Sequence, residues 1–380
     1  MRRSSPSRSR SRPTTTRRRF TTPSTSRRSR TSTRPTSGCR RTRTAADVAL
    51  LDVDDLHVSF STDDGIVQAV RGVSFQVHRG KTLGIVGESG SGKSVATQTV
   101  TGLTRGASVS GSAVFDGLDL LTATEPELRR IRGARIGMIF QDPLTSLHPL
   151  YRVGWQITEL IRAHQAGTSR RTARARAAEL LDLVGIPTAA DRIDDYPYQF
   201  SGGMRQRVMI AMAMALHPDL LIADEPTTAL DVTVQAQILA VMRQVQEEFG
   251  TAIILITHDL GVVAEMAEEV VVMYAGQVME RGLSRDIFYR HHHPYTEGLF
   301  ASLPTHGGSG RLKTIRGLPP SLIQPPAGCP FHPRCDYAFD PCSRDVPDLA
   351  EVGGRADHRS ACWLPHDQTA RTRSPQEVGS

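Results

Sequence analysis

The sequence predicts an α/β protein whose parallel sheet is covered by helices on both faces. Three observations support this fold class: short, fully apolar strands recur along the chain, helical-looking segments separate them, and an alternating apolar pattern precedes the first. Strands without a polar face are typical of a parallel sheet that is buried on both sides. The rest of the pattern adds an antiparallel β subdomain, an all-helical insert and a small cysteine-containing C-terminal extension.

The antiparallel subdomain is expected first along the chain. Residues 51–60 and 67–77 alternate between apolar and polar side chains, and Gly65 lies between them. Two such strands joined by a short turn predict an antiparallel hairpin. The apolar strand at residues 82–86 follows, and it runs into a glycine-rich turn and a helix that begins at about Lys93.

The parallel sheet is expected from three further apolar strands. They lie at residues 136–140, 220–223 and 253–256. The chain between the first two is mostly helical, with an Arg-, Ala- and Leu-rich stretch, and this predicts a helical insert at about residues 143–203. After Gly282 the chain becomes rich in Pro, Gly and His, which predicts a loop-rich extension.

The chain carries 46 basic and 39 acidic residues, but the excess of positive charge belongs to one tail. Residues 1–44 contain 15 Arg and no acidic residue, so the remainder has a net charge of −8. With almost no apolar side chain, residues 1–45 are expected to be disordered. They lack the apolar face of a transit peptide and the apolar segment of a twin-arginine signal. The abrupt change near Ala45 also suggests a start at a non-Met codon such as Val48.

A glycine-rich motif follows the strand at residues 82–86. Residues 87–94 match the phosphate-binding pattern G-x-x-x-x-G-K-[ST], in the strand-to-helix context that the pattern requires. Its glycines let backbone N–H groups turn towards phosphate oxygens at a helix N-terminus. We expect Lys93 to reach the β- and γ-phosphates and Ser94 to bind Mg²⁺. The expected nucleotide-binding residues are Gly87, Glu88, Ser89, Gly90, Ser91, Gly92, Lys93 and Ser94.

Two carboxylates end the apolar strand at residues 220–223. Asp224 can hold Mg²⁺ indirectly, and Glu225 can polarise the attacking water as a general base. Taken alone, two acidic residues at the end of a strand usually indicate only that the strand end is exposed to solvent. Because a phosphate-binding loop precedes them, they favour nucleotide hydrolysis here.

The segment Phe200–Met204 reads F-S-G-G-M and leads into a helix. It resembles the signature of the ABC ATPases, usually written LSGGQ. At a helix N-terminus, Ser201 and the amides of Gly202 and Gly203 can donate hydrogen bonds to a γ-phosphate. The resemblance implies a P-loop ABC ATPase core in which two domains meet head to tail. Each ATP would then lie between the phosphate loop of one subunit and the signature of the other.

Further residues fall where the ABC ATPase pattern has functional side chains. By this resemblance, Gln141 senses Mg²⁺ and water and faces the membrane partner, and His258 contacts the γ-phosphate. Asp231 would organise the dimer seam, and Phe60 is the candidate for the aromatic that stacks on adenine. The resemblance thus implies the catalytic residues Glu225, His258 and Gln141, and the Mg²⁺ ligands Ser94, Gln141 and Asp224.

Longer segments resemble the ATPases of dipeptide and oligopeptide importers. Residues 140–149, 196–207 and 224–233 carry this resemblance in the core, and residues 293–299 and 317–322 are similar to the C-terminal extension of that subfamily. The similarity covers about residues 48–365. It implies a nucleotide-binding domain at residues 46–283, an extension at 284–365 and a polar tail at 366–380.

The same resemblance implies a peripheral subunit on the cytoplasmic face of the cell membrane that hydrolyses ATP. Its partners would be a second ATPase subunit, identical or a paralogue, two membrane permeases and an extracytoplasmic substrate-binding protein. Nickel importers share the extension, so the cargo stays open between peptides and nickel. The competing class is a soluble, non-transport ABC ATPase whose basic tail binds nucleic acid, but nucleic acid is not the expected partner.

Four cysteines fall in the extension, at positions 329, 335, 342 and 362. In a cytosolic protein such a set binds metal more often than it forms disulfides. Their spacing lacks the C-x2-C pairs of a zinc ribbon. Some importer ATPases that resemble this chain carry an iron–sulfur cluster on these cysteines. A 4Fe-4S cluster on Cys329, Cys335, Cys342 and Cys362 is therefore the first expectation, with zinc and unliganded thiols as alternatives.

Overall fold

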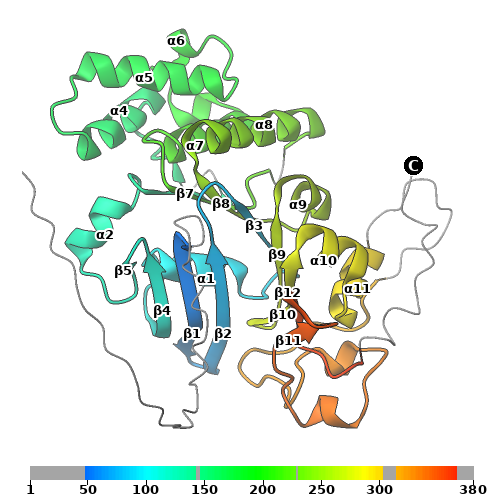
Figure 1. Ribbon diagram of the computed structural model, residues 1–380. Helices are drawn as coiled ribbons and strands as arrows, with labels where there is room; N and C mark the ends of the chain where they lie inside the picture. Colours follow the sequence, from blue (N-terminus) through cyan, green and yellow to red (C-terminus); the bar gives the residue numbers. More distant parts are fainter. Residues whose placement is uncertain (1–47, 143–145, 228–229, 303–313, 366–380) are drawn as a thin grey trace, which may run out of the picture. The chain divides into compact units, whose positions relative to one another are not determined.

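An eight-stranded sheet lies at the centre of the computed structural model, which describes residues 48–142, 146–227, 230–302 and 314–365 (Figure 1). Its strands are β3 (Thr82–Val86), β6 (Ile136–Ile139), β7 (Leu220–Asp224), β8 (Ala252–Ile256), β9 (Glu269–Tyr274), β10 (Gln277–Leu283), β11 (Ala350–Val352) and β12 (Arg355–Ser360). The spatial order is β11-β12-β10-β9-β3-β8-β7-β6. Strands from β9 to β6 are parallel, whereas β10, β12 and β11 pair antiparallel at the other side. The parallel sheet predicted from the apolar strands is confirmed.

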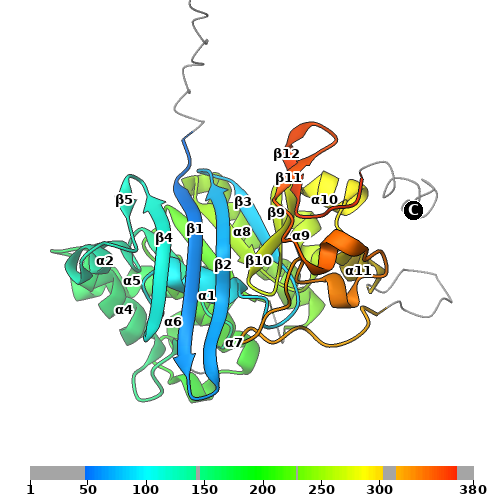
Figure 2. The ribbon, with the colours of Figure 1, turned by 90° about the horizontal axis from the view of Figure 1, so that it is seen from below.

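A second, four-stranded sheet has the order β2-β1-β4-β5. It contains β1 (Leu51–Thr62), β2 (Gly65–Val77), β4 (Ala107–Phe115) and β5 (Leu118–Asp119). Strands β1 and β2 form the predicted hairpin, with Thr62 opposite Gly65 at its turn. Helix α1 (Lys93–Val100) lies behind this sheet (Figure 2). Ala96 and Val100 on α1 are fully buried in a core cluster that both sheets share.

The central strands divide their side chains between two cores. In β7, Leu221 and Ala223 pack in a cluster with the helices, whereas Leu220 and Ile222 pack in the cluster that the two sheets share. Successive side chains of a strand point to opposite faces, and all four of these are 0% exposed. Both faces of the strand are therefore buried, as its uninterrupted apolar sequence predicts.

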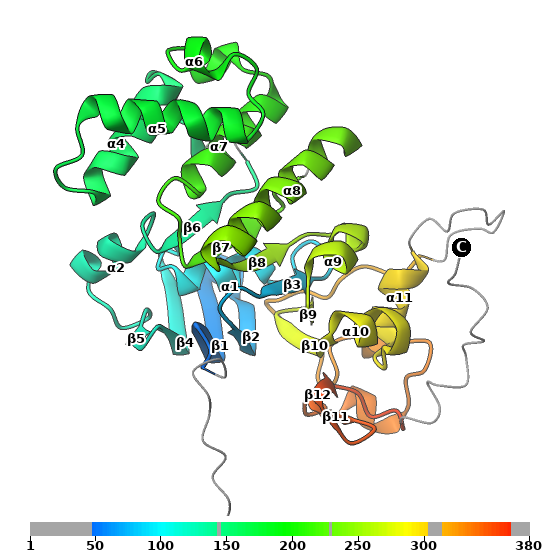
Figure 3. The ribbon, with the colours of Figure 1, turned by 45° about the horizontal axis from the view of Figure 1, so that its top comes forward.

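Helices α4, α5 and α6 stand together beyond the edge of the sheet, above α7 and α8 (Figure 3). They correspond to the predicted helical insert. Helix α5 begins after Ser169, whose hydroxyl accepts a hydrogen bond from the N–H of Thr172. The helices of this part of the chain and of the core are α2 (Glu125–Ile131), α4 (Val153–His164), α5 (Arg170–Leu183), α6 (Ala189–Arg192), η2 (Pro197–Gln199), α7 (Gly202–Ala213), α8 (Val232–Phe249) and α9 (Leu260–Met266).

The C-terminal segment contains more regular structure than its composition predicts. It forms α10 (Ser284–Arg290), α11 (Pro294–Ala301), η3 (His332–Arg334), η4 (Asp340–Ser343) and the β11–β12 hairpin. Strand β12 pairs with β10, so this segment extends the central sheet. Glu280 of β10 is fully buried and accepts hydrogen bonds from the ring of His358 in β12 and from the N–H groups of His292 and His293. Burial alone would raise the pKa of Glu280, but these hydrogen bonds lower it, so the carboxylate stays charged.

Several predictions concern residues that the structure does not describe. The Arg-rich tail, Cys39 within it, the polar C-terminal tail and the start of the predicted insert all lie outside the described residues. Within the described part of the chain, no helix has the length and apolar character needed to span a bilayer.

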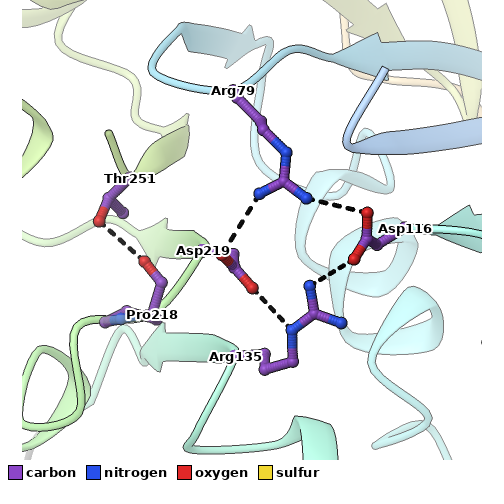
Figure 4. A network of polar contacts seen from close by, with 6 residues as sticks. All are labelled: Arg79, Asp116, Arg135, Pro218, Asp219 and Thr251. Carbon is purple, nitrogen blue, oxygen red and sulfur yellow. Dashed lines mark hydrogen bonds and ion pairs between the residues drawn. The ribbon is translucent and has the colours of Figure 1, made fainter. Parts of the chain in front are cut away.

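Four charged side chains form a closed ring where the two sheets meet (Figure 4). Arg79 lies between Asp116 and Asp219, at 2.9 and 3.3 Å, and Arg135 bonds the other oxygens of the same carboxylates at 2.6 and 2.7 Å. The hydrogen bond from Arg135 lowers the pKa of Asp116. The guanidinium of Arg135 also lies 5.0 Å from the ring centre of Phe115. The ring therefore ties the antiparallel sheet to the residues directly before β6 and β7.

Replacing Arg135 with Ala is expected to lower the free energy of unfolding by about 1 kcal/mol. Single solvent-exposed ion pairs contribute less, but here one side chain bonds two carboxylates and an aromatic face. The measurement is urea unfolding followed by circular dichroism. Arg129→Ala is the matched control, because the ion pair of Arg129 with Glu125 lies on an open helix surface. Equal unfolding curves for the two variants would contradict the prediction.

Candidate functional site

The phosphate-binding loop leaves β3 and enters α1 between the two sheets. Gly87 and Gly92 have φ values of +151° and +96°. A Cβ at Gly87 would collide with the backbone oxygen of Met273 in β9, and a Cβ at Gly92 would collide with that of Ala69 in β2. Because glycine alone lacks a Cβ and adopts positive φ without strain, the shape of this loop depends on glycine at both positions.

Lys93 begins α1, and its side chain folds back over the loop, where it is 7% exposed. Its Nζ donates to the backbone oxygens of Gly87 and Glu88 at 2.8 and 2.9 Å, and to Ser91 Oγ at 3.3 Å. Burial lowers the pKa of Lys93, and nearby carboxylates, foremost Glu225, oppose that shift. The ammonium group thus lies inside the loop that is predicted to hold the phosphates.

Ser94 and Asp224 come together from the loop and the end of β7. The hydroxyl of Ser94 donates to Oδ1 of Asp224 at 2.9 Å. Asp224 is 2% exposed, and burial raises its pKa while the hydrogen bond from Ser94 lowers it. A buried carboxylate beside a hydroxyl provides the oxygen ligands that Mg²⁺ prefers. These residues fit the predicted ion, and their assignment as its ligands stays a prediction.

Glu225 lies between Gln141 and His258, two residues that the sequence places far apart. Nε2 of Gln141 donates to one carboxylate oxygen of Glu225 at 3.1 Å, and Nδ1 of His258 lies 3.4 Å from the other. The backbone of Glu225 has φ +51°, a left-handed conformation that is rare and costly for a residue with a side chain. Strain of this kind is concentrated at functional sites. No sequence pattern predicted it here.

The signature segment is open to solvent at the start of α7. Ser201 is the N-cap residue, and its hydroxyl accepts a hydrogen bond from the N–H of Met204 at 3.3 Å. Ser201 and Gly202 are exposed, and a Cβ at Gly202 would meet no other atom. Among the described residues, no hydrogen bond or ion pair joins this segment to the phosphate loop of the same chain. An exposed helix N-terminus of this kind is free to receive a phosphate from outside.

One residue links the signature helix to the catalytic loop, and another caps α8. Gln206 of α7 is 2% exposed, and its Nε2 donates to the backbone oxygen of Pro226 at 2.8 Å, next to Glu225. Asp231 is the N-cap of α8 and accepts a hydrogen bond from the N–H of Val234 at 3.0 Å. The sequence singled out Asp231 but not Gln206, because a lone glutamine in a helix carries no motif.

Phe60 lies near the end of β1, opposite Val67 of β2 and Ala107 of β4. It is half-buried against the core cluster that the two sheets share. A face of its ring that packs against the protein is not available to a base, so the stacking role of Phe60 on adenine stays a prediction.

The four cysteines of the C-terminal segment line one small cavity together with Phe331. All four are free thiols. Burial, and after it the charge of the neighbouring thiols, raise the pKa of Cys335 to about 11 and that of Cys362 to about 12. The cavity has a volume of about 10 Å³. Among the described residues, no three Cys, His, Asp or Glu side chains are arranged as a metal site.

Two protein families match the chain. The ABC transporter family matches residues 70–228, and the C-terminal region of oligopeptide/dipeptide transporters matches residues 279–342. The first match includes the phosphate loop, the signature and Glu225. The second begins in β10 and includes three of the four cysteines.

Three relatives illustrate how far the similarity extends. The oligopeptide transport ATP-binding protein OppD of Bacillus subtilis is 51% identical over 334 residues, which are 87% of this chain and 92% of that protein. OppD of Haemophilus influenzae is 52% identical over 83% of this chain and 97% of its own. The dipeptide transport ATP-binding protein DppD of Escherichia coli is 48% identical over 85% of this chain and 99% of its own.

Solved structures with the same fold include two ATP-binding cassettes. One is the dimeric structure of the cassette MJ0796 in a post-hydrolysis state bound to ADP and Pi, with a TM-score of 0.58 and 28% identity. It covers 62% of this chain and 99% of that one. CbiO1 from Clostridium perfringens, part of the transporter complex cbiONQ, has a TM-score of 0.53 and 29% identity, and covers 64% of this chain and 91% of that one.

Proposed function

Because this chain belongs to the ATP-binding proteins of oligopeptide and dipeptide ABC transporters, we propose that it hydrolyses ATP to power import of di- or oligopeptides through a separate membrane permease. It would act at the cytoplasmic face of the cell membrane as a peripheral subunit. The relatives described above are named for oligopeptide or dipeptide transport. Those names favour peptide cargo over nickel, and transport over a nucleic-acid role.

The observation that carries the proposal is the position of Glu225 between Gln141 and His258, directly after Asp224. In the proposed reaction, Glu225 accepts a proton from water as the water oxygen bonds to the γ-phosphorus. The bond from that phosphorus to the β–γ bridging oxygen breaks, and ADP and inorganic phosphate result. Gln141 and His258 orient the carboxylate and contact the water and the γ-phosphate.

The phosphate loop supplies binding and charge neutralisation. Lys93 would exchange its bonds to loop carbonyls for contacts with the β- and γ-phosphates, and the loop amides would hold the remaining oxygens. Ser94, Asp224 and Gln141 would hold Mg²⁺, which neutralises charge on the phosphates when bound. Phe60 is our candidate for the contact with adenine.

A single chain holds both a phosphate loop and a signature segment, but the two would bind different ATP molecules. We propose that the exposed Ser201–Gly203 segment binds the γ-phosphate of an ATP on a second ATPase subunit, with Asp231 at the seam between them. Two permeases and a substrate-binding protein complete the transporter. This assembly accounts for an open signature segment that, within the described part of the chain, has no hydrogen bond or ion pair to the phosphate loop.

The test is peptide uptake by the reconstituted transporter. Vesicles that contain this chain, its partner ATPase and the two permeases are supplied with the binding protein and a labelled peptide. We expect uptake that requires ATP, with hydrolysis stimulated by the peptide-loaded binding protein. ATP hydrolysis that proceeds without any peptide uptake across several peptide lengths would contradict the cargo assignment.

For the cysteine pocket we propose that Cys329, Cys335, Cys342 and Cys362 bind a metal group, in the first place a 4Fe-4S cluster and alternatively zinc. The support is chemical: four thiols line one cavity, and each thiolate would raise the pKa of the others unless a cation neutralised them. A cavity of about 10 Å³ has room for one small atom. A cluster therefore requires the four side chains to move outward.

Anaerobic purification of the full-length chain distinguishes these outcomes. A 4Fe-4S cluster would give visible absorbance and about four iron atoms per chain, and Cys342→Ser is expected to remove most of both. Zinc would give a colourless protein with about one zinc atom per chain. A colourless protein without iron or zinc, from cells supplied with both metals, would contradict the proposal.

A further inference from the structure

The phosphate-binding loop is bonded to the C-terminal segment through Glu88. Resting on the proposed ATPase function, we propose that this segment is part of the nucleotide site and that Arg334 is a positioning residue, which holds Glu88 and with it the phosphate loop. The two residues are 246 positions apart in the sequence. The motif of the loop covers residues 87–94 and does not include Arg334.

The ion pair between Arg334 and Glu88 is bidentate and mostly buried. Nη1 and Nη2 of Arg334 donate to the two carboxylate oxygens of Glu88 at 2.6 and 3.0 Å. The side chain of Arg334 is 6% exposed and that of Glu88 24%. Burial alone would lower the pKa of Arg334, but its hydrogen bonds to Glu88 raise it. Paired planar groups of this kind fix orientation as well as charge.

A second contact fixes the backbone at the same loop residue. The N–H of Glu88 donates to the hydroxyl of Tyr295 in α11 at 2.8 Å. Tyr295 is 0% exposed. The backbone oxygen of Glu88 meanwhile accepts the hydrogen bond from Lys93. The C-terminal segment therefore holds the side chain and the N–H of a residue whose carbonyl bonds the principal phosphate-binding lysine.

The support for Arg334 and Tyr295 is itself rigid. Tyr295, Tyr274 and Phe331 pack ring against ring, with centroids 4.6 to 5.4 Å apart. Arg334 also donates to the hydroxyl of Tyr274 at 3.2 Å, and its Nε donates to the backbone oxygen of Arg316 at 2.8 Å. Groups that are held on several sides lose little freedom when they position another residue.

The charge of Glu88 shows why such a partner is needed. A free carboxylate in the phosphate loop would repel the phosphates of an incoming nucleotide, most strongly where water is excluded. Arg334 neutralises this carboxylate from the side of the C-terminal segment. Loss of Arg334 would therefore both loosen the loop and leave a negative charge within it.

The experiment measures ADP binding to the full-length chain by calorimetry, because ADP contacts the phosphate loop without a second subunit. For Arg334→Ala we expect Kd to rise about tenfold. Arg334→Lys, which keeps the charge but loses the paired geometry, should fall between Arg334→Ala and the wild type. Arg344→Ala is the matched control, because Arg344 lies in the same segment and its ion pair with Asp340 is exposed. Its Kd should equal that of the wild type.

The role of Glu88 is tested in the Glu88→Gln background, where Arg334→Ala is expected to change Kd by less than about threefold because no carboxylate is left to neutralise.

Tyr295→Phe keeps the aromatic packing and is expected to raise Kd about threefold, whereas Tyr337→Phe on the surface should not. The Tyr295 variant serves as the test should Arg334→Ala fail to fold.

Three outcomes are decisive. Wild-type affinity in Arg334→Lys, Arg334→Ala and Tyr295→Phe would overturn the positioning role while the proposed function stands. A tenfold loss that persists in the Glu88→Gln background would also overturn it, because Arg334 would then act through another group. A wild-type chain that binds no ADP would overturn the proposed function itself.

Discussion

Replacing Glu225 with Gln is expected to lower the rate of ATP hydrolysis in the assembled transporter by about 100- to 10,000-fold. An amide cannot accept the proton of the attacking water, and general-base catalysis contributes a factor of this size. ATP binding should persist, because the hydrogen bonds that Lys93 and Ser94 make go to loop atoms and to Asp224. The measurement is phosphate release at saturating ATP, beside direct measurement of ATP binding.

The matched control is Glu265→Gln, which removes a surface carboxylate that pairs with Arg243. That variant should hydrolyse ATP at the wild-type rate. Unchanged turnover in Glu225→Gln would mean that another group activates the water. Loss of ATP binding together with turnover would mean that Glu225 acts on the nucleotide and not on the water.

Replacing Lys93 with Met is expected to weaken ATP binding by about 100-fold. Its ammonium group lies inside the phosphate loop and would supply charge-assisted hydrogen bonds to two phosphates. Because burial already lowers the pKa of Lys93, a neutral side chain of similar length should be tolerated in the folded chain. Calorimetry with ATP in the presence of Mg²⁺ provides the affinity.

Lys81→Met is the control for this variant, because Lys81 is 61% exposed and pairs only loosely with Glu268. It should bind ATP like the wild type. If Lys93→Met bound ATP with unchanged affinity, the assignment of this loop to the nucleotide-binding site would be wrong.

The parts of the fold that could be predicted from the sequence are those with a local pattern of apolar and polar residues. The hairpin of β1 and β2 has a regular alternation and a glycine turn, and β3, β7 and β8 are short apolar runs. Strand β4 was missed because residues 107–112 are small or polar except for an exposed Val109, and only the last part of the strand is buried. Strand β12 was missed because it reads R-A-D-H-R-S and is held by His358 against a buried carboxylate. A strand whose buried contact is polar does not show the alternation of apolar and polar residues from which strands are predicted.

For the site, the residue pattern predicted the phosphate loop and the strand-end carboxylates, and the resemblance to the ABC ATPases implied the signature. The structure brings Gln141, Glu225 and His258 together, and their roles are predictions that rest on the resemblance. Gln206 and Arg334 could not be predicted, because each acts on a partner that is distant in sequence and each is an ordinary residue type in its own segment. Contacts of this kind depend on the completed fold.

The left-handed backbone of Glu225 has a consequence for how this protein can change. Most residues avoid that conformation, and glycine alone adopts it freely. The folded chain is therefore less stable, by about 1 kcal/mol or more, than it would be with glycine at this position. Selection for stability alone would remove this carboxylate. The strained carboxylate therefore lowers stability, and only its contribution to activity offsets this loss. In a related protein that has lost its activity, substitutions at this position that raise the stability would no longer be selected against.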